Sequence, residues 1–258
     1  KKHALVPFYR SLSHWCIFLT DPSVYGWKDN TDTIPPIIIH VEDVEMTDSQ
    51  RKALHRETGQ MFAANAGGIT KRHVLSRIAK GLDGSETIKY DYIRDRVLSW
   101  PEKSTIIWCW FNEEQARMEK VLPDALSIKG ATPMGKRREM IHAFQTGRVN
   151  KLISKPDVLG FGLNLQIATK QMFSSLIDSY EKFHQAIHRS NRIGSTEALD
   201  VHIPVLEIER PMAENVLRKM TMIDRDTRTQ ERIFRAAQLG IGLGDTVELE
   251  RMRELHSD

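Results

Sequence analysis

The sequence has only two cysteines in 258 residues, Cys16 and Cys109. This number is too small for a disulfide framework, and neither residue has the spacing of a zinc-ligand pair. The chain also lacks any apolar run near the roughly 18 residues that a membrane-spanning helix needs. Polar residues such as Arg10 and His14 interrupt the N-terminal stretch, which excludes a secretory signal. We therefore expect a cytoplasmic protein with no membrane partner.

The sequence also has no large excess of positive or negative charge. The 37 Lys and Arg residues are nearly balanced by 34 Asp and Glu, which leaves a net charge of +3. Such a balance permits nucleic acid binding but does not predict it. Apolar residues make up 40% of the chain and charged residues 28%, a composition typical of a globular protein with a full hydrophobic core.

A regular alternation of helices and strands begins near Tyr90. The run TIIWCWF is nearly continuously apolar, as in a strand buried on both faces, and Asn112 with Gln115 predicts the cap of the next helix. Amphipathic helices separate further short strands in ALSIK, NKLIS, QMFSSLI and LDVHIPVLE. This order predicts an α/β fold built on a doubly wound parallel sheet.

The segments on either side of this alternation have a different character. Thr47 and Gln50 form a T-x-x-Q capping box that opens a helix over 48–65, and a second helix ends at Gly81. A long charged helix is expected over 211–238. We therefore predict three parts: a lead-in segment with a loop, a strand and helices (1–84), an α/β lobe (85–210), and a C-terminal helix and tail (211–258).

One stretch imitates a phosphate-binding loop. Gly130, Gly135 and Lys136 match the pattern G-x-x-x-x-G-K between a strand and a helix. Arg137 stands where that motif needs a magnesium-binding hydroxyl, and Pro133 lacks a backbone N–H, so a nucleotide site is not predicted here. A basic helix start at Lys136 is unfavourable against the helix dipole, which indicates either a nearby DNA phosphate or a solvated helix end.

The segment ISKPDVLGFGLNLQ follows one of the predicted strands. Ligands of parallel sheets gather at the carboxyl ends of the strands. Gly160, Gly162 and Asn164 come after the strand that ends at Ser154. These glycines allow either the close approach of a ligand or partner lobe, or only tight packing between helix and strand.

A stripe of polar residues follows in YEKFHQAIHRSNRIG. Gln185, Arg189 and Arg192 are spaced i, i+4 and i+7, which places them on one face of a helix closed by Gly194. The glutamine and the strict pattern Q-x-x-x-R-x-x-R-x-G favour an anion-binding face over a solvated, salt-bridging face. We therefore regard these three residues as candidates for contact with phosphate.

The same stretch contains His184 and His188, which have the spacing of a zinc-binding pair. A metalloprotease needs Glu as its general base at the position of Gln185. No third ligand is evident, so no metal site is predicted.

The glycine segment and the arginine stripe together resemble a known family. GFGLNL followed by QAIHRSNRIGS resembles motifs V and VI of superfamily-two helicases, in the form found in Swi/Snf-type DNA translocases. The stretches SKP…LGFGLN, TIIWC…NEEQ and YGWKDN are similar to the phage-encoded branch of that family. The resemblance extends from about residue 20 to residue 238, and it implies that 84–210 is the second of two RecA-like lobes.

The resemblance also implies roles for individual residues. On the nucleotide side, Arg189 and Arg192 would be arginine fingers, supported by Gln185. The backbone around Gly160 and Gly162 would couple that cleft to DNA, and these glycines with Asn164 are also expected on the cofactor side. On the nucleic-acid side would lie Ser154, Lys155, Thr132 and Lys136. ATP and Mg²⁺ would be held mainly by the first lobe, because this sequence has neither a phosphate loop nor an Asp-Glu strand. The expected partners are that first lobe and DNA, in duplex form.

Two positions depart from the family pattern: Leu159 stands where motif V has a glycine, and Ser195 replaces the final glutamine of motif VI. The expectation is the C-terminal lobe of an ATP-dependent DNA helicase or translocase, inactive on its own. Two alternatives remain open at this point. The chain could be a non-catalytic nucleic-acid-binding or regulatory module, or a free-standing α/β enzyme that uses GATPMGK to bind a phosphorylated metabolite.

Overall fold

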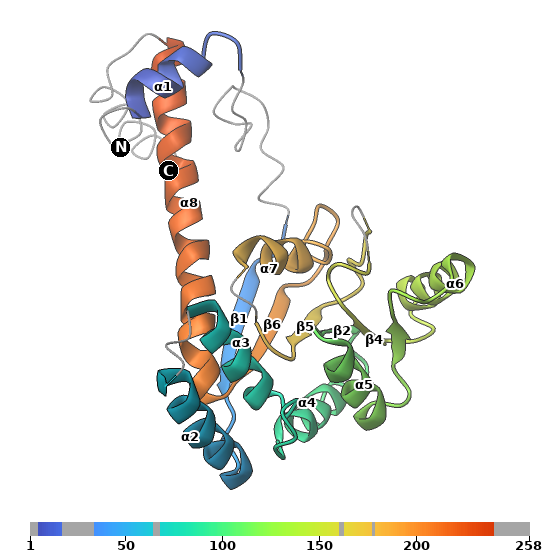
Figure 1. Cartoon of the computed structure of the whole chain (residues 1–258). Helices are drawn as coiled ribbons and strands as arrows, with labels where there is room; N and C mark the ends of the chain where they lie inside the picture. The colour runs from blue at the N-terminus through green and yellow to red at the C-terminus, as the bar shows by residue number, and fades with distance from the viewer. Residues whose placement is uncertain (1–4, 17–33, 64–67, 160–162, 177–178, 240–258) are drawn as a thin grey trace. The chain divides into compact units, whose positions relative to one another are not determined.

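The computed structural model describes residues 5–16, 34–63, 68–159, 163–176 and 179–239. Its contacts divide the chain into two compact units, one made of 1–32 with 218–258 and the other of Thr33–Leu217. The larger unit contains the sheet and the helices between its strands (Figure 1). This division does not coincide with the boundaries at 84 and 210 that the sequence suggests.

A sheet of six parallel strands forms the centre of the larger unit, with the order β1-β6-β5-β2-β4-β3 in the part of the chain that is described. Every residue of β2 and of β4 is buried. Strands buried on both faces are typical of parallel sheets covered by helices, and the predicted α/β fold is confirmed. The strands are β1 (Ile37–Asp43), β2 (Thr105–Trp108), β3 (Leu126–Ile128), β4 (Lys151–Ser154), β5 (Lys170–Phe173) and β6 (Leu199–Val205).

Helices occupy most of the connections and bury their apolar faces on the sheet. Ile93 and Met118, from two different helices, pack with Ile107 and Ile153 of the central strands in one hydrophobic cluster. Burying an aliphatic side chain of this size contributes about 1.5–3 kcal/mol, so this cluster is a main source of stability. The connecting helices are α4 (Lys89–Leu98), α5 (Asn112–Val121), α6 (Met134–Gln145) and α7 (Tyr180–Ile187).

Strand β1 belongs to the same sheet, although it lies in the segment expected to be a separate lead-in. It pairs with β6 in parallel, from Ile37 opposite Leu199 to Asp43 opposite Val205. The rings of His40 and His202 stack across this pair with centroids 4.5 Å apart. The lead-in segment is therefore joined to the lobe by backbone pairing and by side chains.

The capping box predicted at the start of α2 (Asp48–Ala63) is confirmed. The N–H of Gln50 donates to Thr47 Oγ1 at 3.2 Å, and the N–H of Thr47 donates to Gln50 Oε1 at 3.1 Å. The amide nitrogen of Gln50 also donates to the carbonyls of Ile78 and Ala79, which end α3 (Gly68–Ala79), at 2.9 and 3.2 Å. One buried glutamine thus satisfies backbone groups at two helix ends.

The prediction of which residues cap α5 is wrong. The side chain that caps this helix is Glu114 rather than Gln115, because Glu114 Oε2 accepts from the N–H of Trp110 at 2.6 Å. Its other oxygen, Oε1, accepts from the Ser174 hydroxyl at 2.6 Å. Asn112 is the first residue of the helix and not its cap. Glu114 therefore ties the end of β2 to the end of β5, a role that local spacing cannot reveal.

Three buried charges fasten α3 and α4 to the turn η4 (Glu207–Glu209). Lys89 Nζ forms an ion pair with Glu209 Oε2, and Lys80 Nζ lies 3.5 Å from Glu209 Oε1. Burial lowers the pKa of Lys89, opposed by the charge of Glu209. Burial alone would raise the pKa of Glu209, but the charges of Lys89 and Lys80 lower it. The carboxylate stays ionised and compensates two lysines that water cannot reach.

The smaller unit contains α1 (Leu5–Leu12) and the later part of α8 (Arg210–Leu239), the helix that occupies the range predicted as 211–238. The rings of Tyr9 and Phe234 meet edge to face with centroids 6.4 Å apart. Ile233, next to Phe234 in the sequence, is also buried. No helix in the described ranges is both long enough and apolar enough to cross a membrane.

Candidate functional site

The turn after α7 carries the two candidate arginines. Helix α7 begins after Ser179, whose hydroxyl accepts from the N–H of Lys182 at 3.4 Å, and it ends at Ile187. Arg189 and Arg192 therefore lie beyond the helix, in a series of turns. The prediction of one helix closed by Gly194, with three residues on one face, is wrong.

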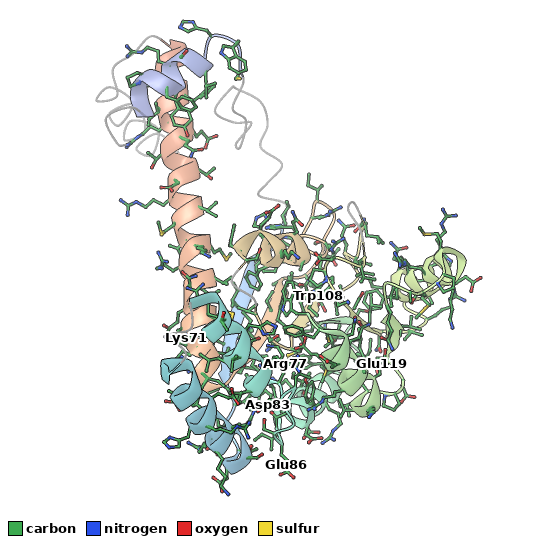
Figure 2. The ribbon with its side chains drawn as sticks, viewed as in Figure 1. Lys71, Arg77, Asp83, Glu86, Trp108 and Glu119 are labelled. Carbon is green, nitrogen blue, oxygen red and sulfur yellow. The ribbon has the colours of Figure 1, made fainter. Side chains whose placement is uncertain are left out.

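Side chains from outside the helix bind the carbonyls at and just beyond the end of α7. Gln171, on β5, donates its amide to the carbonyls of Ala186 and Ile187 at 3.1 and 3.3 Å. Arg192 Nε donates to the carbonyl of His188 at 2.6 Å. The carbonyls of Ala186 and Ile187 also accept from the N–H groups of Arg189 and Ser190, so side-chain and backbone donors together satisfy this helix end. The same glutamine accepts from Trp108 Nε1 at 3.0 Å. Trp108, on β2, is labelled in Figure 2.

The turn itself is closed by Ser195, the residue that stands in place of the family's glutamine. Its hydroxyl donates to the carbonyl of Ser190 at 2.8 Å and accepts from the N–H of Arg192 at 3.2 Å. Gly194 has a φ of 96°, a conformation that favours glycine. A Cβ added at Gly194 would also lie 3.3 Å from the amide nitrogen of Gln166. The backbone around Arg192 is therefore fixed by hydrogen bonds on both sides.

The two arginines have different surroundings. Arg189 is only 5% exposed, and its Nη2 donates to the carbonyl of Pro156 at 3.1 Å. Burial and the neighbouring charge of Arg192 lower the pKa of Arg189, while Asp157 raises it. Arg192 is half-buried and lines an open pocket. Of the pair, Arg192 is the one whose side chain faces space that a ligand could enter.

This pocket has a volume of about 450 Å³ and brings together residues from two of the predicted motifs. Asn164, from the glycine segment, lines it together with Arg192. The lining residues precede β1, β5 and β6, so the pocket lies toward the amino-terminal edge of these strands rather than the carboxyl edge that was predicted. The complete lining is Ile34, Asn164, Gln166, His188, Asn191, Arg192 and Ile193.

Sequence reasoning missed several of these lining residues. Asn191 donates its amide to the carbonyl of Pro35 at 2.7 Å. This bond fixes the chain ahead of β1 against the turn after α7 that carries Arg189 and Arg192, which we call the arginine turn. Gln166 and Asn164 form a pair in which the Asn164 amide donates to Gln166 Oε1 at 2.7 Å. In the sequence, only the number of Asn and Gln residues near Arg192 could have indicated these lining residues.

Gln185, also predicted on the nucleotide side, is not among the residues that line the pocket. Gln185, on α7, donates its amide to Glu181 Oε1 at 3.1 Å. Gly160 and Gly162 lie outside the described residues. The rings of His184 and His188 are 4.1 Å apart. In the described ranges, no group of three or more His, Cys, Asp or Glu side chains is placed to hold a metal ion.

Two residues predicted on the nucleic-acid side follow the carboxyl end of β4. Ser154 is fully buried, and its hydroxyl donates to the carbonyl of Ile128 on β3 at 2.9 Å. Lys155 is next along the chain, and its Nζ donates to Asn112 Oδ1 at 2.5 Å. Ser154 therefore joins two strands, whereas Lys155 presents a charge at the edge of the sheet.

The other two, Thr132 and Lys136, lie in the loop that follows β3 and at the start of α6. Thr132 Oγ1 accepts from the N–H of Lys129 at 2.9 Å, and Lys136 is exposed. Arg137 Nη2 donates to the carbonyls of Lys129 and Gly130 at 3.3 and 3.1 Å. The loop thus turns carbonyl oxygens toward a cation, whereas a phosphate loop turns N–H groups toward an anion.

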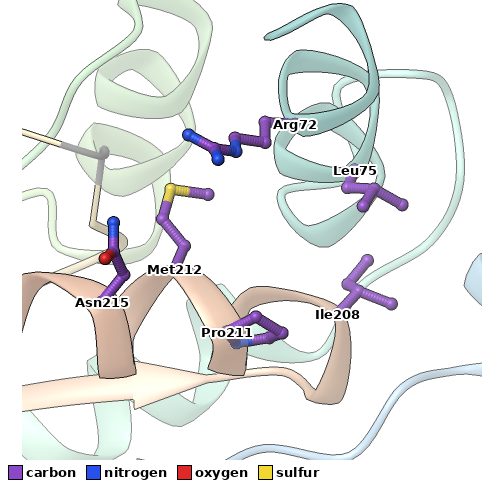
Figure 3. Close-up of a pocket in the computed structure, with 6 residues that line it drawn as sticks. All are labelled: Arg72, Leu75, Ile208, Pro211, Met212 and Asn215. Atoms are coloured by element: carbon purple, nitrogen blue, oxygen red, sulfur yellow. The ribbon is translucent and has the colours of Figure 1, made fainter. Parts of the chain in front are cut away.

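A second pocket, of about 270 Å³, lies between α3 and the start of α8. Figure 3 shows Arg72 and Leu75 from α3 on one side, and Ile208, Pro211 and Met212 on the other. Asn215 completes its lining. None of these residues belongs to a motif that the sequence singles out.

Comparison with known proteins defines the class of the lobe. Residues 88–194 match the family described as the helicase conserved C-terminal domain. This range contains the arginine turn and the segment from Ser154 to Asn164. The central part of the chain is therefore similar to helicase C-terminal domains.

Among solved structures, the chain is similar to the C-terminal part of the Fun30 ATPase domain. The TM-score is 0.59 with 14% identity, over 71% of this chain and 90% of that one. This likeness shows a RecA-like fold. A second similar structure is the E. coli DEAD-box protein SrmB bound to regulator of ribonuclease activity A, with a TM-score of 0.45 and 20% identity over 51% and 78% of the two chains. No curated protein matches the sequence.

Proposed function

We propose that this chain is the second RecA-like lobe of an ATP-dependent DNA translocase or helicase of the Swi/Snf type, close to those encoded by phages. The observation that carries the proposal is that Arg192 and Asn164 line one open pocket. These residues come from the two segments that resemble motifs V and VI. The match of residues 88–194 to the helicase C-terminal domain supports the same assignment.

In this proposal Arg192 acts on the phosphates of ATP. Its Nε is bound to the carbonyl of His188 at 2.6 Å, which orients the guanidinium before any ligand arrives. A preorientated cation stabilises charge that develops on a transferring phosphoryl group. ATP and Mg²⁺ would be bound mainly by a first RecA-like lobe, since the only loop here with phosphate-loop spacing presents carbonyl oxygens. The chain therefore supplies part of a shared site.

The nucleic-acid side of the proposal rests on Lys155, Lys136 and Thr132. Lys155 follows the carboxyl end of β4, and Thr132 and Lys136 follow that of β3. Ser154 links these two strands through the carbonyl of Ile128. Lysines at such an edge bind phosphates without reading bases. With a net charge of only +3, the lobe alone should bind duplex DNA weakly, independently of sequence, and with a shallow dependence on salt.

The direct test is ATP hydrolysis by the purified 258-residue chain, with and without duplex DNA. We expect no turnover above background, and DNA-dependent turnover once the lobe is joined to its first RecA-like lobe. DNA-dependent hydrolysis by the chain alone would contradict the shared site. Tight, sequence-specific DNA binding at physiological salt would favour the non-catalytic binding module instead.

A further inference from the structure

The two edges of the sheet are unequal. In the described part of the chain, β1 lies at one end of the sheet and β3 at the other (Figure 1). β3 has only three residues, whereas β1 has seven, with the sequence IIIHVED. Long apolar edge strands pair readily with other strands, and natural proteins usually protect them with lysine, proline or a bulge. β1 contains neither lysine nor proline, and its register with β6 is continuous.

The backbone groups of β1 point alternately toward β6 and toward the open edge. The carbonyl of Pro36 accepts from the N–H of Leu199 at 3.0 Å, and the N–H of Val44 donates to the carbonyl of Val205 at 2.9 Å. Since the direction alternates from one residue to the next, the even-numbered residues bind β6. The odd-numbered residues of Ile37–Asp43 therefore direct their N–H and C=O groups away from β6. These groups have no hydrogen-bond partner among the described residues.

The side chains at this edge are largely apolar. Ile37, Ile39 and Val41 lie on one face of β1, because side chains alternate between the faces of a strand. Val41 is 40% exposed, and the two isoleucines are half-buried. Ile38, on the other face, is 44% exposed. Exposed apolar side chains beside unpaired backbone groups form a surface that an added strand can cover.

A second copy of β1 fits this edge in the antiparallel orientation. When Ile39 lies opposite Ile39 of the second copy, Ile37 lies opposite Val41, and every pair on this face is apolar. All three residues direct their backbone groups outward, so each pair can exchange two hydrogen bonds. Asp43 stays outside the paired stretch and keeps its ion pair with Arg210. The edge is thus complementary to itself in one register.

We propose that β1 is a homodimer interface, at which the sheets of two copies join across a two-fold axis into one continuous sheet. Such a contact occupies β1 of both copies and closes, so the dimer is the final assembly. A single pair of strands buries a small area, and we therefore expect a dissociation constant in the micromolar range. This inference does not depend on the proposed function.

The test is analytical ultracentrifugation of the 258-residue chain between about 1 and about 200 µM, where a reversible equilibrium of monomer and dimer is expected. Val41→Pro removes an N–H that does not bind β6, and proline is tolerated at such positions of edge strands. The substitution should raise the dissociation constant by at least about tenfold, because each copy loses a hydrogen bond to the other.

Two lysine variants provide a matched comparison. Val41→Lys places a cation in the apolar stripe and should weaken the dimer as Val41→Pro does. Met134→Lys makes the same change of charge at an exposed apolar residue of α6 and should leave the dissociation constant within about twofold. If Val41→Pro does not fold, Val41→Lys decides the question.

Cross-linking tests the register. In a Cys16→Ser background, Ile39→Cys should form a disulfide between copies, because the Cα atoms of a hydrogen-bonded antiparallel pair lie about 5.5 Å apart. Ile37→Cys lies opposite Val41 rather than opposite itself, and it should cross-link much less.

Several outcomes would overturn the inference. A chain that stays monomeric over the whole concentration range, or that forms assemblies larger than a dimer, does not pair through β1. A dimer that both Val41 variants leave unchanged is formed by another surface. Equal cross-linking of Ile37→Cys and Ile39→Cys would contradict the register and with it the complementarity of the edge.

Discussion

Arg137 Nη2 donates a hydrogen bond to the carbonyl oxygen of Gly130, 3.1 Å away. These residues belong to GATPMGKR, the stretch with the spacing of a phosphate loop. A carbonyl that binds a guanidinium repels a phosphate oxygen, so the loop has the wrong polarity for ATP. The loop has the residue spacing of a nucleotide site, but it does not have the hydrogen-bonding pattern of one.

Replacing Lys136 with alanine therefore should not affect nucleotide binding. In the two-lobed protein we expect Lys136→Ala to leave the affinity for ATP within a few-fold of normal, as measured by calorimetry. Duplex DNA binding should weaken at most modestly, and its salt slope should fall by about one unit. Arg138→Ala, which removes a neighbouring exposed charge, is the matched control. Loss of ATP binding in folded Lys136→Ala would contradict the assignment of the lobe.

The buried carboxylate of Glu209 predicts a large effect on stability. Glu209→Gln would leave Lys89 and Lys80 without their counter-charge in the interior. Removing one partner of a buried ion pair typically costs about 3–5 kcal/mol, and we expect a decrease of this size in the free energy of unfolding. Urea denaturation of the 258-residue chain measures it.

Glu207 provides the control, because it lies in the same short turn but is exposed. Glu207→Gln should change the free energy of unfolding by less than about 0.5 kcal/mol. Equal effects of the two substitutions would mean that the buried charges do not fasten α3 and α4 to the lobe.

His202 predicts how stability depends on pH. Burial lowers the pKa of His202 from its ordinary value of 6.5, although Glu42 raises it and His40 and Arg96 lower it further. Its Nδ1 lies 2.8 Å from Glu42 Oε1, while its buried Nε2 has no hydrogen-bond partner in the described part of the chain. Protonation would place an unsatisfied N–H in the interior, against the ring of Trp100 at 4.4 Å.

Because this pKa is lower in the folded chain, the unfolded chain binds more protons as pH falls through 6.5. The free energy of unfolding should therefore decrease between about pH 7 and about pH 5. The free energy of unfolding of His202→Gln should decrease less steeply over the same range. Identical slopes for this variant and the unchanged chain would contradict this explanation.

The fold was predictable from local patterns because each one has a single physical interpretation. An apolar run such as TIIWCWF suits a strand that is covered by helices on both faces of a sheet. The capping box of Thr47 and Gln50 forms as its spacing predicts. The place of β1 was not predictable. Its partner, β6, begins at Leu199, and no local signal shows which distant strand will pair.

Two predicted residues, Arg192 and Asn164, line the pocket, but the geometry around them was not predictable. Helical spacing predicts Arg189 and Arg192 on one face of a helix, yet α7 ends at Ile187 and both arginines lie in the turns beyond it. The contact from Arg189 to Pro156 joins residues far apart in the sequence. Contacts of this kind depend on tertiary packing, which a pattern along one helix does not contain.

The most direct test of the second-lobe assignment is the turnover of Arg192→Ala in the protein that joins this chain to its first RecA-like lobe. We expect DNA-dependent ATP hydrolysis to fall by about three orders of magnitude, the usual scale for the loss of an arginine finger, while affinity for duplex DNA is retained. Near-normal turnover by a folded Arg192→Ala protein would contradict the account.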